Sequence, residues 1–235
     1  MSHQLQNCIA RDKLEFPQAH YAFRKAHEAA IELGNEEFLA AALAREGVTY
    51  IQERNPREAI KHLSGAINCI HYKGLPNLKG HILQALAEAH SMAGNSQESW
   101  RNLGLAERAL ESLGDVPEYS LARFNAASIT AHRGIVAAQL KEHSYAITLL
   151  NKSLMGYDPT MIRDRARLLA QKAEAFLGLE RIEECAATAE EAVTLARSVR
   201  SNRTITLIES ISDSLRDSRW RKEPSVARLH GVLAI

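Results

Sequence analysis

The sequence predicts an all-α protein, a right-handed solenoid of about five antiparallel helix pairs closed by capping helices at its C-terminal end. Three observations support this prediction. A set of small and larger residues recurs along the 235-residue chain at steps of about 40 residues. Asparagine and proline stand where helices would begin, and glycine stands where they would end. No stretch alternates apolar and polar residues convincingly in the manner of a β-strand.

The recurring set has five positions. A small residue is followed three residues later by a larger one, then nine later by a small one, four later by an apolar one and three later by another small one. Offsets of three and four place residues on one helical face, and small side chains let two helices approach closely. The copies are Asn7, Ala10, Ala19, Phe23, Ala26; Gly47, Tyr50, Ala59, Leu63, Ala66; Ala87, His90, Ser99, Leu103, Ala106; Gly134, Ala137, Ala146, Leu150, Ser153; and Ala173, Phe176, Cys185, Ala189, Ala192.

The copies divide a single predicted domain, residues 1–235, into five repeats and a C-terminal cap. The repeats are expected at 5–34, 36–73, 77–113, 118–156 and 160–199, with capping helices within 203–233. A longer loop is expected around residues 113–118, where the step between copies is largest. Helix starts are predicted at Asn35, Asn55-Pro56, Asn95 and Asp158-Pro159, and helix ends at Gly34, Gly74, Gly94 and Gly114.

Composition limits the compartment and the class of partner. The formal net charge is +1, so no global charge attracts nucleic acid or an anionic membrane. Three cysteines far apart in the sequence fit a reducing cytoplasm better than a disulfide framework. Neither a secretory signal nor an apolar run of about 18 residues is present, so a cytoplasmic protein without a membrane span is expected.

The repeated residues resemble the tetratricopeptide consensus in a longer form of roughly 40 residues. The chain from about residue 5 to 233 also resembles the C-terminal repeat half of bacterial helix-turn-helix regulators of the xenobiotic-response-element type. The residues that carry this second resemblance are 86–94, 184–192 and 220–233. In that family the repeat half is sensory or binds proteins. The first repeat begins so close to Met1 that no DNA-reading domain is expected, and DNA binding by this chain is not predicted.

Chemical motifs are few. His81 and His90 are too far apart to share a metal ion, and no Cys-x-x-Cys occurs, so neither a metal nor another cofactor is predicted. Cys185 stands where the repeat requires a small residue, which favours a core role over a nucleophile. The basic residues around Trp220 are interrupted by Asp217 and fit a solvated helix end. An enzyme is therefore not expected.

The tetratricopeptide resemblance implies that the first helix of each pair lines a concave surface. Polar residues at these inner positions are the candidate groove residues for a peptide, a helix or a small polar ligand. They are Arg45, Gln52, His81, Gln84, Glu88, His132, Gln139, Arg167, Gln171 and Glu174.

The leading functional hypothesis is a non-catalytic scaffold or sensor module that binds a protein or peptide segment in this groove. One alternative is the ligand-sensing half of a transcription regulator whose DNA-binding domain is absent here. Another is a self-assembling structural scaffold, since exposed apolar residues on terminal helices would favour a homo-oligomer.

Overall fold

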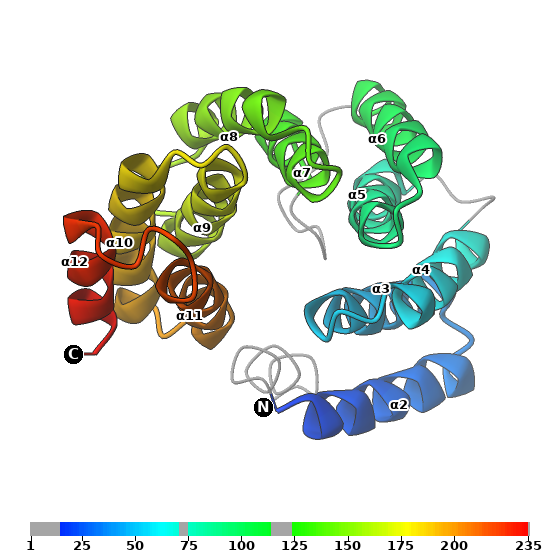
Figure 1. Ribbon diagram of the computed structural model, residues 1–235. Helices are drawn as coiled ribbons and strands as arrows, with labels where there is room; N and C mark the ends of the chain where they lie inside the picture. The colour runs from blue at the N-terminus through cyan, green and yellow to red at the C-terminus, as the bar shows by residue number, and fades with distance from the viewer. Residues whose placement is uncertain (1–14, 71–74, 114–123, 235) are drawn as a thin grey trace. The chain divides into compact units, whose positions relative to one another are not determined.

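The computed structural model describes residues 15–70, 75–113 and 124–234, and every regular element in these ranges is an α-helix (Figure 1). The all-helical prediction is therefore confirmed for the described residues. The helices are α2 (Phe16–Glu32), α3 (Glu36–Gln52), α4 (Pro56–Cys69), α5 (Pro76–Met92), α6 (Ser96–Glu111), α7 (Ala126–Gln139), α8 (His143–Gly156), α9 (Ile162–Gly178), α10 (Ile182–Ser198), α11 (Asn202–Arg216) and α12 (Pro224–Leu233). None of them is long and apolar enough to cross a membrane.

The chain divides into two compact units, residues 1–132 and 133–235, with the division inside α7. In the first unit α2 packs on α3, α3 on α4, α4 on α5 and α5 on α6, and α5 also contacts α3. In the second unit α8 packs on α9 and α9 on α10, while α11 and α12 cover α10 and contact each other. Both helices predicted for the C-terminal end of the chain are confirmed by α11 and α12.

Asparagine side chains begin three of the helices, as predicted. The Oδ1 atoms of Asn35, Asn55 and Asn95 accept hydrogen bonds from the backbone N–H three residues later, at 3.0, 3.3 and 3.1 Å. Each bond satisfies one of the N–H groups that a helix N-terminus leaves without a partner. The predicted start at Asp158-Pro159 is wrong, since α9 begins only at Ile162.

Asp158 closes a turn before α9 instead. Its Oδ1 accepts bonds from the backbone N–H and the hydroxyl of Thr160, at 2.8 and 2.6 Å. These bonds hold the pKa of the Asp158 carboxyl below its usual value, chiefly through the hydroxyl. A capping residue thus stands where predicted, but it stabilises a loop, because Asp competes for local backbone groups in turns as readily as at helix starts.

One type of turn joins six pairs of consecutive helices. In each, a single residue has a left-handed backbone, and the next residue donates its N–H to the carbonyl five residues earlier, at 2.8 to 3.0 Å. This is the bond of a Schellman turn, which ends a helix tightly. The left-handed residues are Gly34, Arg54, Gly94, Lys141, Glu180 and Arg200. The predicted helix ends at Gly34 and Gly94 are thereby confirmed, whereas Gly74 and Gly114 lie outside the described residues.

Every five-residue set from Gly47 onward that the sequence identifies is at a helix–helix contact. The first, third, fourth and fifth positions of these four copies are all buried. Gly47 of α3 lies so close to α4 that a Cβ atom there would be 2.6 Å from Leu63 Cγ. Gly134 of α7 has the same relation to Leu150 of α8, at 2.8 Å. Of the incomplete first copy, Ala19 and Phe23 are buried, and Asn7 and Ala10 lie outside the described residues.

Candidate functional site

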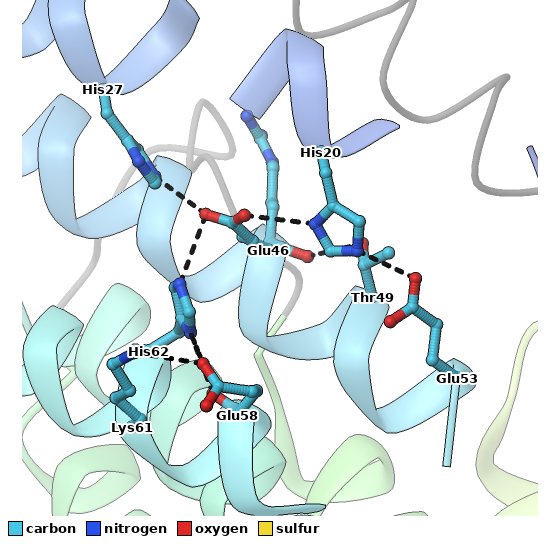
Figure 2. Close-up of polar contacts among 9 residues, drawn as sticks. His20, His27, Glu46, Thr49, Glu53, Glu58, Lys61 and His62 are labelled. Carbon is cyan, nitrogen blue, oxygen red and sulfur yellow. Dashed lines mark hydrogen bonds and ion pairs between the residues drawn. The ribbon is translucent and has the colours of Figure 1, made fainter. Parts of the chain in front are cut away.

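The most concentrated group of titratable side chains in the described residues lies where α2, α3 and α4 meet in the first unit. We call it the histidine–glutamate cluster, and Figure 2 shows it in detail. It consists of His20 and His27 from α2, Glu46 from α3, Glu53 at the C-cap of α3, and His62 from α4. On α2 the two histidines are seven residues apart, as are the two glutamates of α3 and its C-cap, so each pair shares one helical face.

The Glu46 carboxylate is the centre of the cluster, and the residue is only 5% exposed. Its Oε1 lies 3.1 Å from Nδ1 of His20. Its Oε2 lies 3.5 Å from Nε2 of His27 and 3.6 Å from Nε2 of His62. A buried carboxylate is costly unless hydrogen bonds or opposite charge compensate it. Here His20 supplies a hydrogen-bond contact, and His27 and His62 lie within ion-pair distance of the other oxygen.

His20 bridges the carboxylates of Glu46 and Glu53. Its Nδ1 faces Glu46, and its Nε2 lies 2.8 Å from Oε1 of Glu53. A neutral imidazole carries one N–H, and an ionised carboxylate only accepts, so a neutral ring can donate to one of the two glutamates. The protonated ring donates to both. The two contacts of His20 with ionised carboxylates can therefore both be hydrogen bonds only if the ring carries two protons.

His62 has a different hydrogen-bond pattern. Its Nδ1 lies 2.9 Å from the backbone carbonyl of Glu58, one turn earlier on α4. Because a carbonyl only accepts, Nδ1 carries the proton and donates, and Nε2 is the atom that faces Glu46. The Glu58 side chain is bound by Lys61 at 3.1 Å, which holds the pKa of this carboxyl below its usual value.

Tyr50 separates the rings of His20 and His62. Its ring centroid lies 4.5 Å from that of His20 and 4.9 Å from that of His62, both in tilted arrangements. Burial raises the pKa of the Tyr50 phenol, and the charges of Glu46, Glu53 and Glu58 raise it further. The side chain is thus a neutral aromatic wall between two titratable rings.

His27 is the ring that the fold prefers to keep neutral. Burial lowers its pKa most, the nearby His62 lowers it too, and Glu46 opposes both effects. Its Nε2 is buried and has no hydrogen-bond partner. The fold therefore disfavours the charged form of His27, because the ring loses hydration when it becomes charged.

No group of three His, Cys, Asp or Glu side chains in residues 15–70, 75–113 and 124–234 is placed to hold a metal ion. His81 and His90 were the histidines that the sequence suggested, and the histidine–glutamate cluster was not predicted. The available signal was the seven-residue spacing in each helix, but that spacing does not show which helices touch.

Three of the predicted groove residues come together in the first unit, between α5 and the N-terminal half of α7. Gln84 donates to the Ser128 hydroxyl at 3.0 Å. Glu88 Oε2 lies 3.7 Å from Nε2 of His132, whose Nδ1 donates to the Ser128 carbonyl. Gln84 is 1% exposed and Glu88 is also buried, so these side chains connect two helices and present little surface to a ligand.

The other predicted groove residues are all half-buried. Arg45 and Gln52 lie on α3 and His81 on α5, in the first unit. In the second unit Gln139 lies on α7, and α9 carries Arg167, Gln171 and Glu174. The side-chain oxygens of Gln52, Gln84 and Gln171 are buried without a hydrogen-bond partner, so each amide keeps an unused acceptor.

Cys185 and the basic segment near Trp220 have the surroundings of structural residues. Burial raises the pKa of the Cys185 thiol to about 12, so the nucleophilic thiolate is scarce near neutral pH. Arg219 lies over the Trp220 ring at 4.4 Å and pairs with Glu180. Arg216 pairs with Asp213 at 2.8 Å.

Comparison with known proteins assigns no family to this chain. No protein-family model matches the sequence. No curated protein matches it either.

Proposed function

We propose that this chain is a helical-repeat scaffold of the tetratricopeptide type, which binds a protein or peptide segment non-covalently. In this proposal the helix pairs stack serially into a right-handed solenoid, and the first helices of the pairs line its concave surface. The protein works in the cytoplasm and performs no covalent chemistry on its partner. In the alternative proposal, the same surface senses a ligand for the DNA-binding domain of a transcription regulator.

The recurrence of one turn at one position of the pattern is the observation that carries the proposal. The carbonyl that accepts the five-residue turn bond belongs to Tyr50, His90, Ala137 and Phe176. These four residues are the second position of four successive copies of the pattern. The same local structure thus ends the first helix of four predicted pairs, as expected where one structural unit is repeated along a chain.

Tight packing within the pairs supports the same reading. The contact between Gly47 and Leu63 and the contact between Gly134 and Leu150 join residues sixteen positions apart. They occur in different compact units of the chain. Such matched contacts fix the position of one helix against the next, and repeats built in this way commonly serve as binding surfaces.

Peptide selection can test the binding activity. A phage-displayed library of random 12-residue peptides would be selected against the full chain, and the enriched peptides measured by fluorescence anisotropy. Arg45→Ala and Arg167→Ala should each weaken binding several-fold, because both remove a half-buried cation from the proposed inner face. Arg101→Ala is the matched control, since Arg101 is exposed on α6 and pairs only locally with Glu98.

Two results would count against the proposal. One is the absence of any enriched peptide after repeated selection on correctly folded protein. The other is a set of enriched peptides that binds both inner-face variants as tightly as the unchanged chain. Circular dichroism of each variant would establish that the helices are intact before affinities are compared.

A further inference from the structure

We propose that His20 makes the docking of α2 onto α3 depend on protonation, because only the doubly protonated ring can hold Glu46 and Glu53 at the same time. The inference concerns the internal stability of the first unit and does not rest on the proposed binding activity. In the protonated state the ring links α3 and its C-cap to α2. In the neutral state one of the two carboxylates loses its donor.

The packing of α2 on α3 can depend strongly on a polar contact, because α2 buries few apolar residues. The helix buries only Ala19, Phe23 and Ala30. In contrast, α5 of the same unit buries eleven residues, of which seven are apolar. Segments with little buried apolar surface open at lower free-energy cost than the body of a domain. A pair of charge-assisted hydrogen bonds is therefore a large share of what holds α2 in place.

The surroundings of His20 favour this role for it over the other two histidines. Glu46 and Glu53 are the two acceptors of its ring, the first within α3 and the second at the residue that directly follows it. His62 contacts Glu46 but not Glu53, since its Nδ1 binds the Glu58 carbonyl on its own helix. Desolvation lowers the pKa of His27, so this ring resists the second proton.

Other charged groups near the cluster do not replace the His20 proton. Arg24 of α2 acts on the neighbouring Tyr50 through its charge. From α4, Lys61 bonds to Glu58. The His62 ring faces the second oxygen of Glu46, away from the oxygen that His20 contacts. The bridge between Glu46 and Glu53 is therefore a property of the His20 ring.

The direction of the pH effect follows from the donor count. The contact of the ring with both carboxylates is complete under acidic conditions, where imidazole is protonated, and incomplete under alkaline conditions, where imidazole is neutral. His27 acts in the opposite direction, because its lowered pKa favours the fold at higher pH. A melting curve of the unchanged chain adds the two effects, so a test must isolate the His20 contact.

A double-mutant cycle with His20→Gln and Glu53→Gln isolates it, because Glu46, His27 and His62 remain in all four proteins. Urea midpoints of the full chain would be measured at pH 5.5 and pH 8.0. We expect the two substitutions to be more strongly non-additive at pH 5.5 than at pH 8.0, because a neutral ring can donate to only one of the two carboxylates. Lys25 and Glu28, an exposed pair on α2 with a 2.7 Å contact, form the control cycle. The coupling of this pair should be the same at both values, because it joins an ammonium group to a carboxylate and contains no imidazole.

Equal coupling of His20 and Glu53 at both pH values, or stronger coupling at pH 8.0, would overturn the proposal. A second measurement needs no variant. Proton–nitrogen NMR spectra of the imidazole rings should show both ring nitrogens of His20 protonated at a pH where His27 has already become neutral. If His20 loses its second proton at a lower pH than His27 does, the ring does not hold Glu46 and Glu53 at the same time in the way proposed.

Discussion

Gly134 lies directly against the side chain of Leu150, and a Cβ atom on this glycine would come within 2.8 Å of Leu150 Cγ and 2.9 Å of Cδ2. The backbone nitrogen of Leu150 is also close, at 3.3 Å. The helices α7 and α8 therefore touch where one of them has no side chain. Gly47 and Leu63 repeat this relation between α3 and α4, with Leu63 Cγ at 2.6 Å.

Both contact glycines should resist replacement. Gly47→Ala and Gly134→Ala are each expected to lower the free energy of unfolding by about 1–3 kcal/mol, because the added methyl group overpacks a closed contact. Gly104→Ala is the matched control. Gly104 lies within α6 with no neighbouring atom near the position of a Cβ, so alanine there should stabilise the helix by about 0.5–1 kcal/mol. Urea denaturation of the three variants measures the effects, and a stabilising Gly134→Ala would contradict the packing described here.

The left-handed turn residues should respond to glycine in a predictable direction. Arg54 and Lys141 have φ angles of 56° and 64°, which strain a residue with a Cβ atom. Arg54→Gly and Lys141→Gly should therefore raise stability by about 1 kcal/mol. Gly94→Ala should lower it by a similar amount, because Gly94 has a φ of 75° in the same turn. Thermal melts monitored by circular dichroism test this, and opposite signs are required for the two kinds of substitution.

Gln84 should contribute to stability although it was a candidate for ligand contact. The side chain is buried and donates to Ser128, so Gln84→Ala removes packing and a hydrogen bond together. A loss of about 1–3 kcal/mol is expected. Ser128→Ala should share part of this loss, and the double variant should lose less than the sum. A melting temperature unchanged by Gln84→Ala would show that the contact between α5 and α7 is absent in solution.

Cys185 should be chemically inert in the folded protein. Its thiol is buried and its pKa is raised to about 12, so at pH 8 the thiolate that reacts with iodoacetamide is rare. Cys69 is half-buried and should react faster, although burial raises its pKa as well. Mass spectrometry of peptides after timed alkylation separates the two sites. Rapid labelling of Cys185 without urea would contradict this prediction and would support a reactive thiol at this position.

His27 should make the protein more sensitive to acid. Burial lowers its pKa in the folded chain, so below the ordinary imidazole value the unfolded chain takes up a proton that the folded chain resists. The stability that the neutral ring contributes is present above that value and is lost as pH falls through it. His27→Gln should therefore reduce the loss of stability between about pH 7 and pH 5, measured by urea midpoints. His90→Gln is a useful comparison, because burial lowers the pKa of that ring too.

Local interactions made much of the fold predictable. Asn35, Asn55 and Asn95 could be identified as helix starts because a cap bonds to a backbone group only three residues away. Asp158 shows the limit of this inference, since the same local bond closes a turn just as well. The recurring five-residue sets from Gly47 onward were predictable because helix contacts impose a period that is visible in the sequence.

The candidate site was less predictable, because it depends on contacts between helices far apart in the chain. His20 and Glu46 are 26 residues apart, and Gln84 and Ser128 are 44 apart. The sequence by itself determined which residues are helical and which small residues mark the tight contacts, since spacing along one helix encodes both. Only the tertiary structure decided that His20 meets two carboxylates and that Gln84 is buried. The reason is that the burial and charge of a side chain depend on the neighbouring helix that it faces, and periodicity within a single helix does not specify that neighbour.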